Sequence, residues 1–596
     1  MKFTVLGAIF VAAVKAHEEY EEVQSSGDLA NARNSDTGPT TMDMPQNMSG
    51  DMSGTVNMPG MDMGESMNDP HDHSNSNQSS ALIPSPASHK GGHSHGTPIL
   101  SMLDMLEPQQ RAYWLAYDPT TFFNADSGSK NLLYLHSILQ IGILGYLLPT
   151  VSLMAFDRSS QWLYVPLQTL IVILFLASTL VCSIYSLTLN KPLYDGNCYP
   201  IVTVLFLVTL VVHWVAVISK SITSGFGTAL DGVEYHMTNM ERASLDSGHE
   251  NGDSVEELME ETPTPLPRRS ALIQKLANSR FSGVFRAFHG VSTLTVKLLT
   301  VPLVLFGIAY LEIGTFIAFR MGFGRYVFGL LAHSIKGTIF VIFGFLEMAR
   351  YFGAWASKGM AWNTVQIYSK DELPQPWYRR MFPRYPTMEF MQSFMIFFYG
   401  STNIFLEHLG STDGKWTPKD LQHASIAFMF FGGGLCGMVV ESEAISTYLA
   451  SAFGFNSNRR NTRSWSFNPF PAMVVFWTGA LMSQHQQETP LATAIHVQWG
   501  MLLSCAALIR GLTYGLMYVS NRSGCETPQR PFTELICSFC LICGGLIFVL
   551  SNRESVEGMI YQGTSSMFTL VVGVGITSLL MVAAAFSIAL KGWAKR

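Results

Sequence analysis

The stretch WLYVPLQTLIVILFLASTLVCSIYSLTL, residues 162–189, contains no Asp, Glu, Lys or Arg. It is longer than the roughly 20 apolar residues that a helix needs to cross the hydrocarbon core of a bilayer. Similar apolar stretches recur at approximately 132–156, 201–219, 296–319, 326–348, 390–406, 421–448, 469–482, 492–519, 532–550 and 565–590. We therefore predict an all-α multi-pass integral membrane protein with about eleven transmembrane helices.

The composition agrees with a membrane protein. Of the 596 residues, 48% are hydrophobic and 13% are charged, against roughly 25% charged residues in soluble domains. The mean hydropathy is +0.22. A net charge of −6 shows no basic excess, so a nucleic-acid partner is disfavoured. The chain contains neither a phosphate-binding G-x-x-x-x-G-K-[ST] loop nor an H-E-x-x-H metalloprotease motif, which disfavours those enzyme classes.

The first residues are typical of a signal peptide. Lys2 precedes an apolar run that is too short to span a bilayer, and we expect cleavage near Ala16. The composition then divides the chain into a disordered, Met- and His-rich lumenal or extracellular tail (17–130), a three-helix membrane module (131–222), an acidic Pro/Ser cytoplasmic linker (223–290) and an eight-helix membrane module (291–596). Asn47 and Asn77 begin glycosylation sequons, which suits a lumenal tail.

The basic residues predict the orientation. If the mature N-terminus lies outside, the loops that fall in the cytoplasm hold most of the Lys and Arg, as cytoplasmic loops generally do. Examples on that side are Arg379, Arg380, Arg459 and Arg460, whereas few basic residues, such as Lys191, fall outside. We therefore expect a lumenal or extracellular N-terminus and a cytoplasmic C-terminus, in a membrane of the secretory pathway or the plasma membrane.

The tail has the residue types of a metal-binding segment. Thioethers are soft ligands that suit Cu(I), and imidazoles suit Cu(II) and Zn(II). The alternative is a low-complexity segment without a ligand, since composition alone is weak evidence. The candidate ligands are Met42, Met44, Met61, Met63, His71, His73, His93 and His95.

Five histidines of the larger module fall toward the predicted outer ends of its spans. Ionisable groups are costly in a bilayer and often functional there, and such a layer can coordinate a transition metal or relay protons. The alternative is that each histidine only hydrogen-bonds a neighbouring helix. Glu347 and Arg350, three residues apart near the cytoplasmic side, are interpreted as a structural ion pair. The candidate layer comprises His333, His408, His423, His485 and His496, with Glu407 and Glu488.

Several segments carry a family resemblance. They are HSIKGTIFVIFG from His333, WASKGMAWN from Trp355, FFYGSTNIFLEHLG from Phe397, DLQHASIAFMFFGGGLCGMVVES from Asp420, and HVQWG followed by RGLTY. Together they resemble the fungal Ytp-type family of multi-pass membrane proteins over most of residues 131–590. LEHLG with LQHASIAFMFF is more distantly similar to the animal transmembrane-protein-45-like family. Neither resemblance implies a reaction.

The smaller module is distantly similar to ascorbate-type b cytochromes. In LHSILQIGILGYLLPTVSLMAFDRSSQWLYVPLQ, from Leu135, a histidine opens the span and a proline ends it, as in that family. The resemblance implies a second histidine after the aromatic dipeptide, where this chain has Val165 and Pro166. The remaining haem candidates, His136 and His213, differ in depth by about 10 Å at helical rise. We therefore expect no stoichiometric haem.

These observations favour a non-enzymatic membrane protein that binds or transports a transition metal, copper first, from its lumenal or extracellular side. The alternatives are a membrane electron-transfer protein or metal reductase of the cytochrome b type, and a non-catalytic scaffold or trafficking protein. The lipid bilayer is the expected partner, with a metal ion as ligand and no nucleic acid.

Overall fold

The computed structural model describes residues 97–157, 159–190, 192–246, 282–324, 326–363, 386–406, 416, 418–454, 467–520 and 528–596. Within these residues, every regular element is a helix. Nine helical segments are long and apolar enough to cross a membrane. The fold class predicted from the sequence is therefore confirmed.

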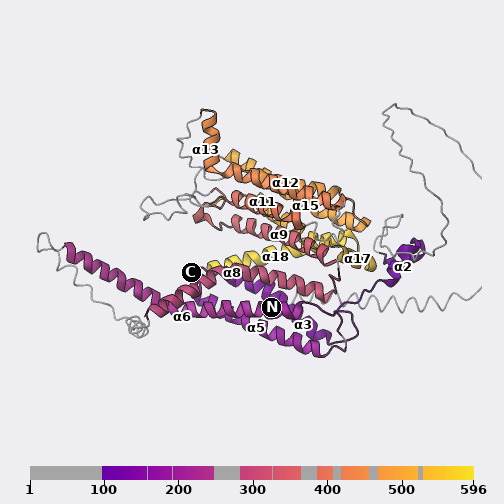
Figure 1. The fold of residues 1–596 in the computed structure, drawn as a ribbon, viewed down its shortest axis with the longest axis horizontal. Coiled ribbons are helices and arrows are strands. Elements are labelled where there is room, and N and C mark those ends of the chain that lie inside the picture. Colours follow the sequence, from indigo (N-terminus) through magenta and orange to yellow (C-terminus); the bar gives the residue numbers. More distant parts are fainter. Residues whose placement is uncertain are drawn as a thin grey trace, which may run out of the picture. The chain divides into compact units, whose positions relative to one another are not determined.

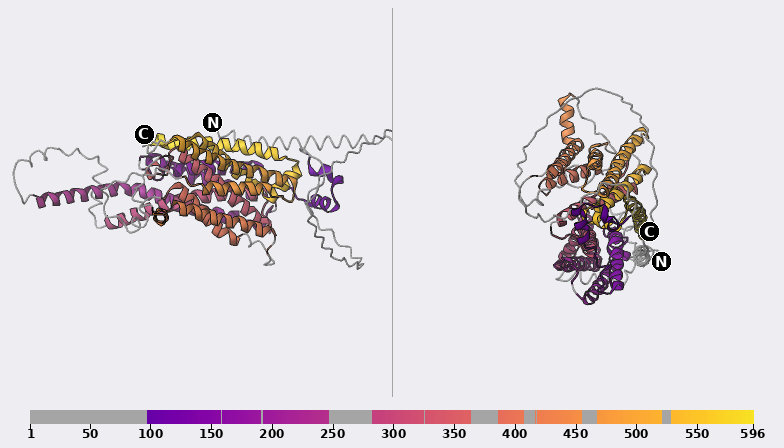
Figure 2. Two further views of the ribbon diagram at one scale, coloured as in Figure 1. Left: turned by 90° about the horizontal axis from the view of Figure 1, so that it is seen from above. Right: turned by 90° about the vertical axis from the view of Figure 1, so that its right-hand side faces the viewer.

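The long helices run alongside one another, whereas the short helix α13 points across their direction (Figures 1 and 2). Their bounds, in chain order, are η1 (Ile99–Met105), α2 (Pro108–Ala116), α3 (Lys130–Gln140), η2 (Ile141–Leu147), α4 (Leu148–Ser152), α5 (Gln161–Leu187), α6 (Tyr199–Asp246), α8 (Ser282–Ala318), α9 (Tyr326–Tyr351), η3 (Ala356–Lys358), α11 (Met388–Leu406), α12 (Pro418–Glu441), α13 (Glu443–Ala452), α14 (Phe470–Gln484), α15 (Pro490–Ser520), α16 (Phe532–Leu550), α17 (Arg553–Gln562) and α18 (Ser566–Ala594).

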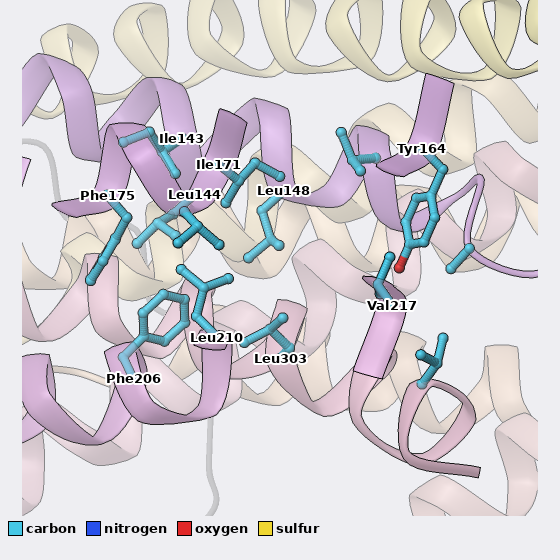
Figure 3. Packing of buried hydrophobic residues seen from close by; sticks show 14 of the residues in the cluster. Ile143, Leu144, Leu148, Tyr164, Ile171, Phe175, Phe206, Leu210, Val217 and Leu303 are labelled. Atoms are coloured by element: carbon cyan, nitrogen blue, oxygen red, sulfur yellow. The ribbon is translucent and has the colours of Figure 1, made fainter. Parts of the chain in front are cut away.

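Helices α3 to α6 and α8 form the first bundle. Its first span is continuous through α3, η2 and α4, and η2 is a π-helical turn. Pro149 follows that turn and has no N–H for the preceding carbonyls, which accounts for the widened turn. Helix α8 packs along α6 and contacts α4. The core includes Leu144, Leu148, Phe175, Phe206 and Leu303, all at most 1% exposed (Figure 3).

Helix α16 is the centre of the second bundle, and it packs most extensively along α9 and α15. Of its spanning segment, 67% is buried, against 17% for α18. Gly337 of α9 and Gly545 of α16 face each other, and a Cβ on either would lie 2.6 Å from the other's carbonyl oxygen. The backbones therefore approach as closely as small residues allow, as is common between membrane helices.

The structure refines the boundaries expected from composition. Of the eleven predicted spans, those at 390–406 and 469–482 correspond to α11 and α14, which are helical but are not among the nine candidate spans. Helix α6 continues to Asp246 and α8 begins at Ser282, so helix occupies both ends of the predicted linker. The expectation of disorder does not hold for residues 97–130, because Trp114 and its neighbours are buried against the rest of the chain. The signal peptide and residues 17–96 of the tail lie outside the described residues.

The glycine contact between α9 and α16 yields a test with a matched control. We expect Gly337→Ala to lower the free energy of unfolding by about 1–3 kcal/mol, because the added methyl group overpacks a backbone contact. Gly329→Ala is the control on the same helix, since its Cβ would have nothing within 4 Å. Thermal unfolding of the purified protein in detergent measures both. Equal melting temperatures for the two variants would contradict the close packing.

Candidate functional site

Two of the predicted outer histidines face each other between α9 and α15. The ring centroids of His333 and His496 are 6.1 Å apart and the planes cross at 84°. His496 is 3% exposed, and His333 is half-buried beside Phe548. Each Nδ1 lies 2.8 Å from the carbonyl oxygen four residues earlier, Gly329 for His333 and Ala492 for His496. A carbonyl only accepts, so both Nδ1 atoms are donors and each Nε2 carries the lone pair.

The other predicted site residues do not join this pair in one cluster. His423 is on α12, His485 ends α14, and Glu488 is 3.8 Å from Arg553 with its side chain 62% exposed. Among the described residues, no group of three or more His, Cys, Asp or Glu is close enough to hold a metal ion. The remaining candidates lie outside the described residues: Met42, Met44, Met61, Met63, His71, His73, His93, His95, Glu407 and His408.

The segment that follows the tail is anchored at the same end of the second bundle. Ile99, Leu106 and Trp114 form a small buried cluster with Tyr561 of α17. The backbone at Thr97 and Pro98 passes so close to Gly563 that a Cβ there would lie 2.6 Å from the Pro98 nitrogen. Helix α17 in turn contacts α9 and α15, the helices that carry His333 and His496.

Electrostatics fix this anchored segment. Asp118 accepts a hydrogen bond from Arg320 at 2.7 Å. Hydrogen bonding by Thr120 and the charge of Arg320 lower the pKa of Asp118 to about 2, so this carboxylate stays ionised through the physiological range. Burial, and then the charge of Glu557, raise the pKa of Tyr117 to about 12, so its hydroxyl stays neutral.

The two haem candidates make hydrogen bonds within the first bundle. His136 contacts the Ser178 carbonyl through Nδ1 at 3.0 Å and the Tyr199 hydroxyl through Nε2 at 2.7 Å. His213 contacts Gln168 at 3.2 Å and Thr300 at 3.1 Å. Both ring nitrogens of each histidine thus bridge neighbouring helices, in the structural role that polar residues often have between membrane helices.

The other end of the second bundle contains a buried ion cluster, which we define as Glu347, Arg350, Glu389, Arg510 and Glu534. Their side chains are at most 7% exposed. Arg510 bonds Glu534 through Nε at 2.9 Å and lies 2.7 Å from Glu347 through Nη2. Arg350 donates to Glu389 at 2.8 Å. The cluster therefore connects α9, α11, α15 and α16.

Trp362 covers the ion cluster from the segment after α9. Its ring is fully buried, with the Cζ of Arg350 3.8 Å and that of Arg510 5.2 Å from the ring centroid. Such cation–π contacts stabilise a desolvated guanidinium. The next residue, Asn363, is buried with a positive φ of 55°.

The histidine pair and the ion cluster lie at opposite ends of the same helices. Fourteen residues separate His333 from Glu347, and the same number separates His496 from Arg510, which is about 21 Å of helix. Beside the histidine pair, the rings of Trp499 and Phe548 stack at 4.0 Å with a 6° angle between their planes. The ring of Phe548 is 5.6 Å from that of His333, and the ring of Trp499 is 5.6 Å from that of His496.

Comparison with known proteins identifies the family. Residues 306–592 match the family model described as "Protein YTP1-like, C-terminal", and residues 116–223 match a domain of unknown function, DUF2427. The chain is 35% identical to "Uncharacterized membrane protein YCR061W" of Saccharomyces cerevisiae, over 84% of this chain and 88% of that protein. The chain belongs to the YTP1-like family.

Other YTP1-like relatives extend the comparison. The chain is 32% identical to "Uncharacterized membrane protein C3B8.06" of Schizosaccharomyces pombe, over 79% of this chain and 96% of that protein. It is 23% identical to "Protein YTP1" of Saccharomyces cerevisiae over 48% and 50% of the two chains. No solved structure matches at a significant level. The resemblance to the Ytp-type family is thus confirmed, and the protein is a multi-pass integral membrane protein.

Three members of the ion cluster escaped the sequence analysis. Glu347 and Arg350 were expected to pair with each other, and they do form an ion pair at 3.9 Å, although each has a closer partner on another helix. The missed residues are Glu389, Arg510 and Glu534. The available signal was that Arg510 and Glu534 are ionisable residues within predicted spans.

Arg510 should be essential for the stability of the second bundle. We expect Arg510→Met to lower the free energy of unfolding by about 3–5 kcal/mol, because it leaves Glu347 and Glu534 buried beside fewer positive charges. Arg111→Met is the control, since the Arg111 side chain is 52% exposed and that of its partner Asp104 is 94% exposed; its effect should be below about 1 kcal/mol. Thermal unfolding in detergent compares them, and similar losses would argue against the cluster's importance.

The anchoring of residues 97–117 on α17 can be tested at a glycine. Gly563→Ala should release this segment, because the new methyl group meets the Thr97 and Pro98 backbone. Gly196→Ala is the control: Gly196 has a similar positive φ, 70° against 72°, but nothing lies within 4 Å of its Cβ. Limited proteolysis of the purified protein should cut residues 97–117 faster in Gly563→Ala alone. Equal cleavage in both variants would contradict the anchoring.

Proposed function

We propose that this membrane protein binds a transition metal ion, copper first, at the His333/His496 end of its second bundle, and passes it on across the membrane. The observation that carries the proposal is the facing pair of imidazoles from α9 and α15, 6.1 Å apart. The metal is the substrate in this proposal. No catalytic step is implied.

The tautomers of the two histidines suit a metal. A metal-ligating histidine usually donates its other ring N–H to a carbonyl or carboxylate, which fixes the ring and leaves the ligating lone pair. His333 and His496 have this arrangement, with Nδ1 bonded to Gly329 and Ala492. Two imidazoles do not make a complete site for Cu(II) or Zn(II). His408 and Glu407, which were predicted for the same outer layer, lie outside the described residues.

The anchored segment supports delivery by the tail. Residues 97–117 pack on α17, and α17 contacts both histidine-bearing helices. The proposal assigns collection of the ion to the tail, which is continuous in sequence with this anchored segment. A tether of this kind raises the local concentration of a bound ion near the pair.

The histidine pair should determine the affinity of the folded bundle for Cu(I). We expect His333→Ala and His496→Ala each to weaken Cu(I) binding at least about tenfold, which corresponds to about 1.4 kcal/mol. Competition with a chromophoric Cu(I) chelator measures this on protein lacking residues 17–96, so that the tail does not mask the site. His289→Ala is the control, because His289 bonds Thr223 in the first bundle. If all three variants bind Cu(I) like the parent protein, the metal proposal fails and a scaffold function becomes the better explanation.

The tail should bind Cu(I) in a manner that resists acid. Histidine is protonated below about pH 6.5, whereas a thioether has no proton to lose. A peptide of residues 41–96 should therefore bind Cu(I) at pH 5 as well as at pH 7. Changing Met42, Met44, Met61 and Met63 to Leu should abolish binding at pH 5, while changing His71, His73, His93 and His95 to Ala should not. Absence of Cu(I) binding at both pH values would remove the tail from the proposal.

A further inference from the structure

The ion cluster is not electrically balanced. It contains three carboxylates, of Glu347, Glu389 and Glu534, and two guanidiniums, of Arg350 and Arg510. Three negative and two positive charges leave an excess of one negative charge in a site whose members are at most 7% exposed. An uncompensated buried charge is strongly destabilising. The N-terminal turns of α11 and α16, which hold Glu389 and Glu534, offset part of this excess, and a proton would neutralise the rest.

The distances show where the excess lies. Arg350 donates to Glu389, and Arg510 holds Glu534 through both Nε and Nη2, at 2.9 and 2.8 Å. In each of these two ion pairs, one guanidinium neutralises one carboxylate. Glu347 is the third carboxylate, and its Oε2 lies 2.7 Å from the same Nη2 of Arg510 that Glu534 approaches.

The oxygens around this nitrogen lack hydrogen bonds. Oε2 of Glu347 and Oε2 of Glu534 are both buried, and neither receives a well-directed hydrogen bond although both lie at ion-pair distance from Arg510. The other oxygen of Glu347 accepts from the amide of Gln392. Two buried carboxylate oxygens thus approach one donor nitrogen, while Nη1 of Arg350, which also lacks a hydrogen bond, is 3.9 Å from Oε2 of Glu347. Two carboxylates that are held close together can share a proton.

Within the described residues, each element packed around Glu347 and Glu534 contributes the following titratable and charged groups. Helix α9 contributes Arg350, α11 contributes Glu389, α15 contributes Arg510 and Tyr514, and α16 contributes Cys537, whose Sγ is 4.0 Å from Nη2 of Arg510. The segment after α9 contributes Trp362, which is aromatic and neutral. Of these groups only the two arginines are cations, and both are already counted.

We propose that Glu347 and Glu534 form a proton-binding site in which the two carboxylates share one exchangeable proton. The proton replaces the missing positive charge and supplies the hydrogen bond that the two Oε2 atoms lack. The site is close to a membrane boundary, because Arg350 is the penultimate residue of α9, and Glu389 and Glu534 lie in the first turns of α11 and α16.

This proposal is independent of the metal proposal. It concerns the opposite end of α9 and α15, about 21 Å away along the helices, and none of its residues is a metal candidate. Loss of metal binding would leave it intact, and loss of the proton would leave the histidine pair intact.

Infrared spectroscopy of the full-length protein in lipid tests the proposal directly. The starting protein carries Glu312→Gln, because Glu312 is another carboxylate within a span, which accepts from the Ser334 and Thr338 hydroxyls and would contribute its own signal. We expect this protein to show the carbonyl band of a protonated carboxyl group, and to lose it as about one proton per chain is released at high pH. Adding either Glu347→Gln or Glu534→Gln should remove the band, whereas Glu488→Gln, at an exposed site, should not.

Stability provides a second measurement. The folded protein holds a proton that the unfolded chain releases above the ordinary pKa of glutamate, about 4.3, so its melting temperature should fall as the pH rises. Glu347→Gln imitates the protonated state and should lose this part of the pH dependence, while Arg510→Gln should be destabilised at every pH. The control Glu488→Gln should retain the pH dependence of the parent.

Three results would overturn the proposal. The first is a protonated-carboxyl band that is absent from the Glu312→Gln protein, a measurement that requires no cluster variant to fold. The second is a band that persists in both Glu347→Gln and Glu534→Gln. The third is stabilisation of the parent at pH 8 by Na⁺ or K⁺ but not by choline, which would assign the missing positive charge to a metal cation.

Discussion

The constraint on which the second bundle depends is that a charge removed from water inside a membrane must meet an opposite charge. Arg510 satisfies this constraint for two helices at once, since its Nη2 approaches Glu347 of α9 and Glu534 of α16 from α15. The cost of breaking such a buried pair is several kcal/mol. Ion pairs as well as shape therefore determine which of the helices α9, α15 and α16 are neighbours. Trp362 is buried against the two guanidiniums that these ion pairs immobilise.

Close packing of small residues acts toward the middle of the helices. Gly337 and Gly545 let the backbones of α9 and α16 touch at mid-span, and α16 is mostly enclosed as a result. Trp499 and Phe548 fill the space next to this contact by stacking face to face.

Much of the fold could be predicted from the sequence, and the reasons are physical. Apolar length alone determines whether a helix can span, so the segment 162–189 was recognisable without any partner. The boundaries between ordered and disordered segments were harder to predict, because composition reflects solvation and not packing. Residues 97–130 contain many polar residues, yet Trp114 and Tyr117 contact α17. The continuation of α6 to Asp246 was likewise hidden by its polar sequence.

The functional residues were predictable to the extent that their partners are close in sequence. The histidines could be assigned to one side of the membrane from their positions in the spans, and His333 and His496 do lie together, but nothing in the sequence shows which two of the five meet. Glu389, Arg510 and Glu534 come from three different helices, so no spacing rule connects them. Once the members of the cluster are known, their formal charges can be added. The sum distinguishes a structural ion network, in which the charges cancel, from the proton-binding site proposed above, in which one negative charge remains.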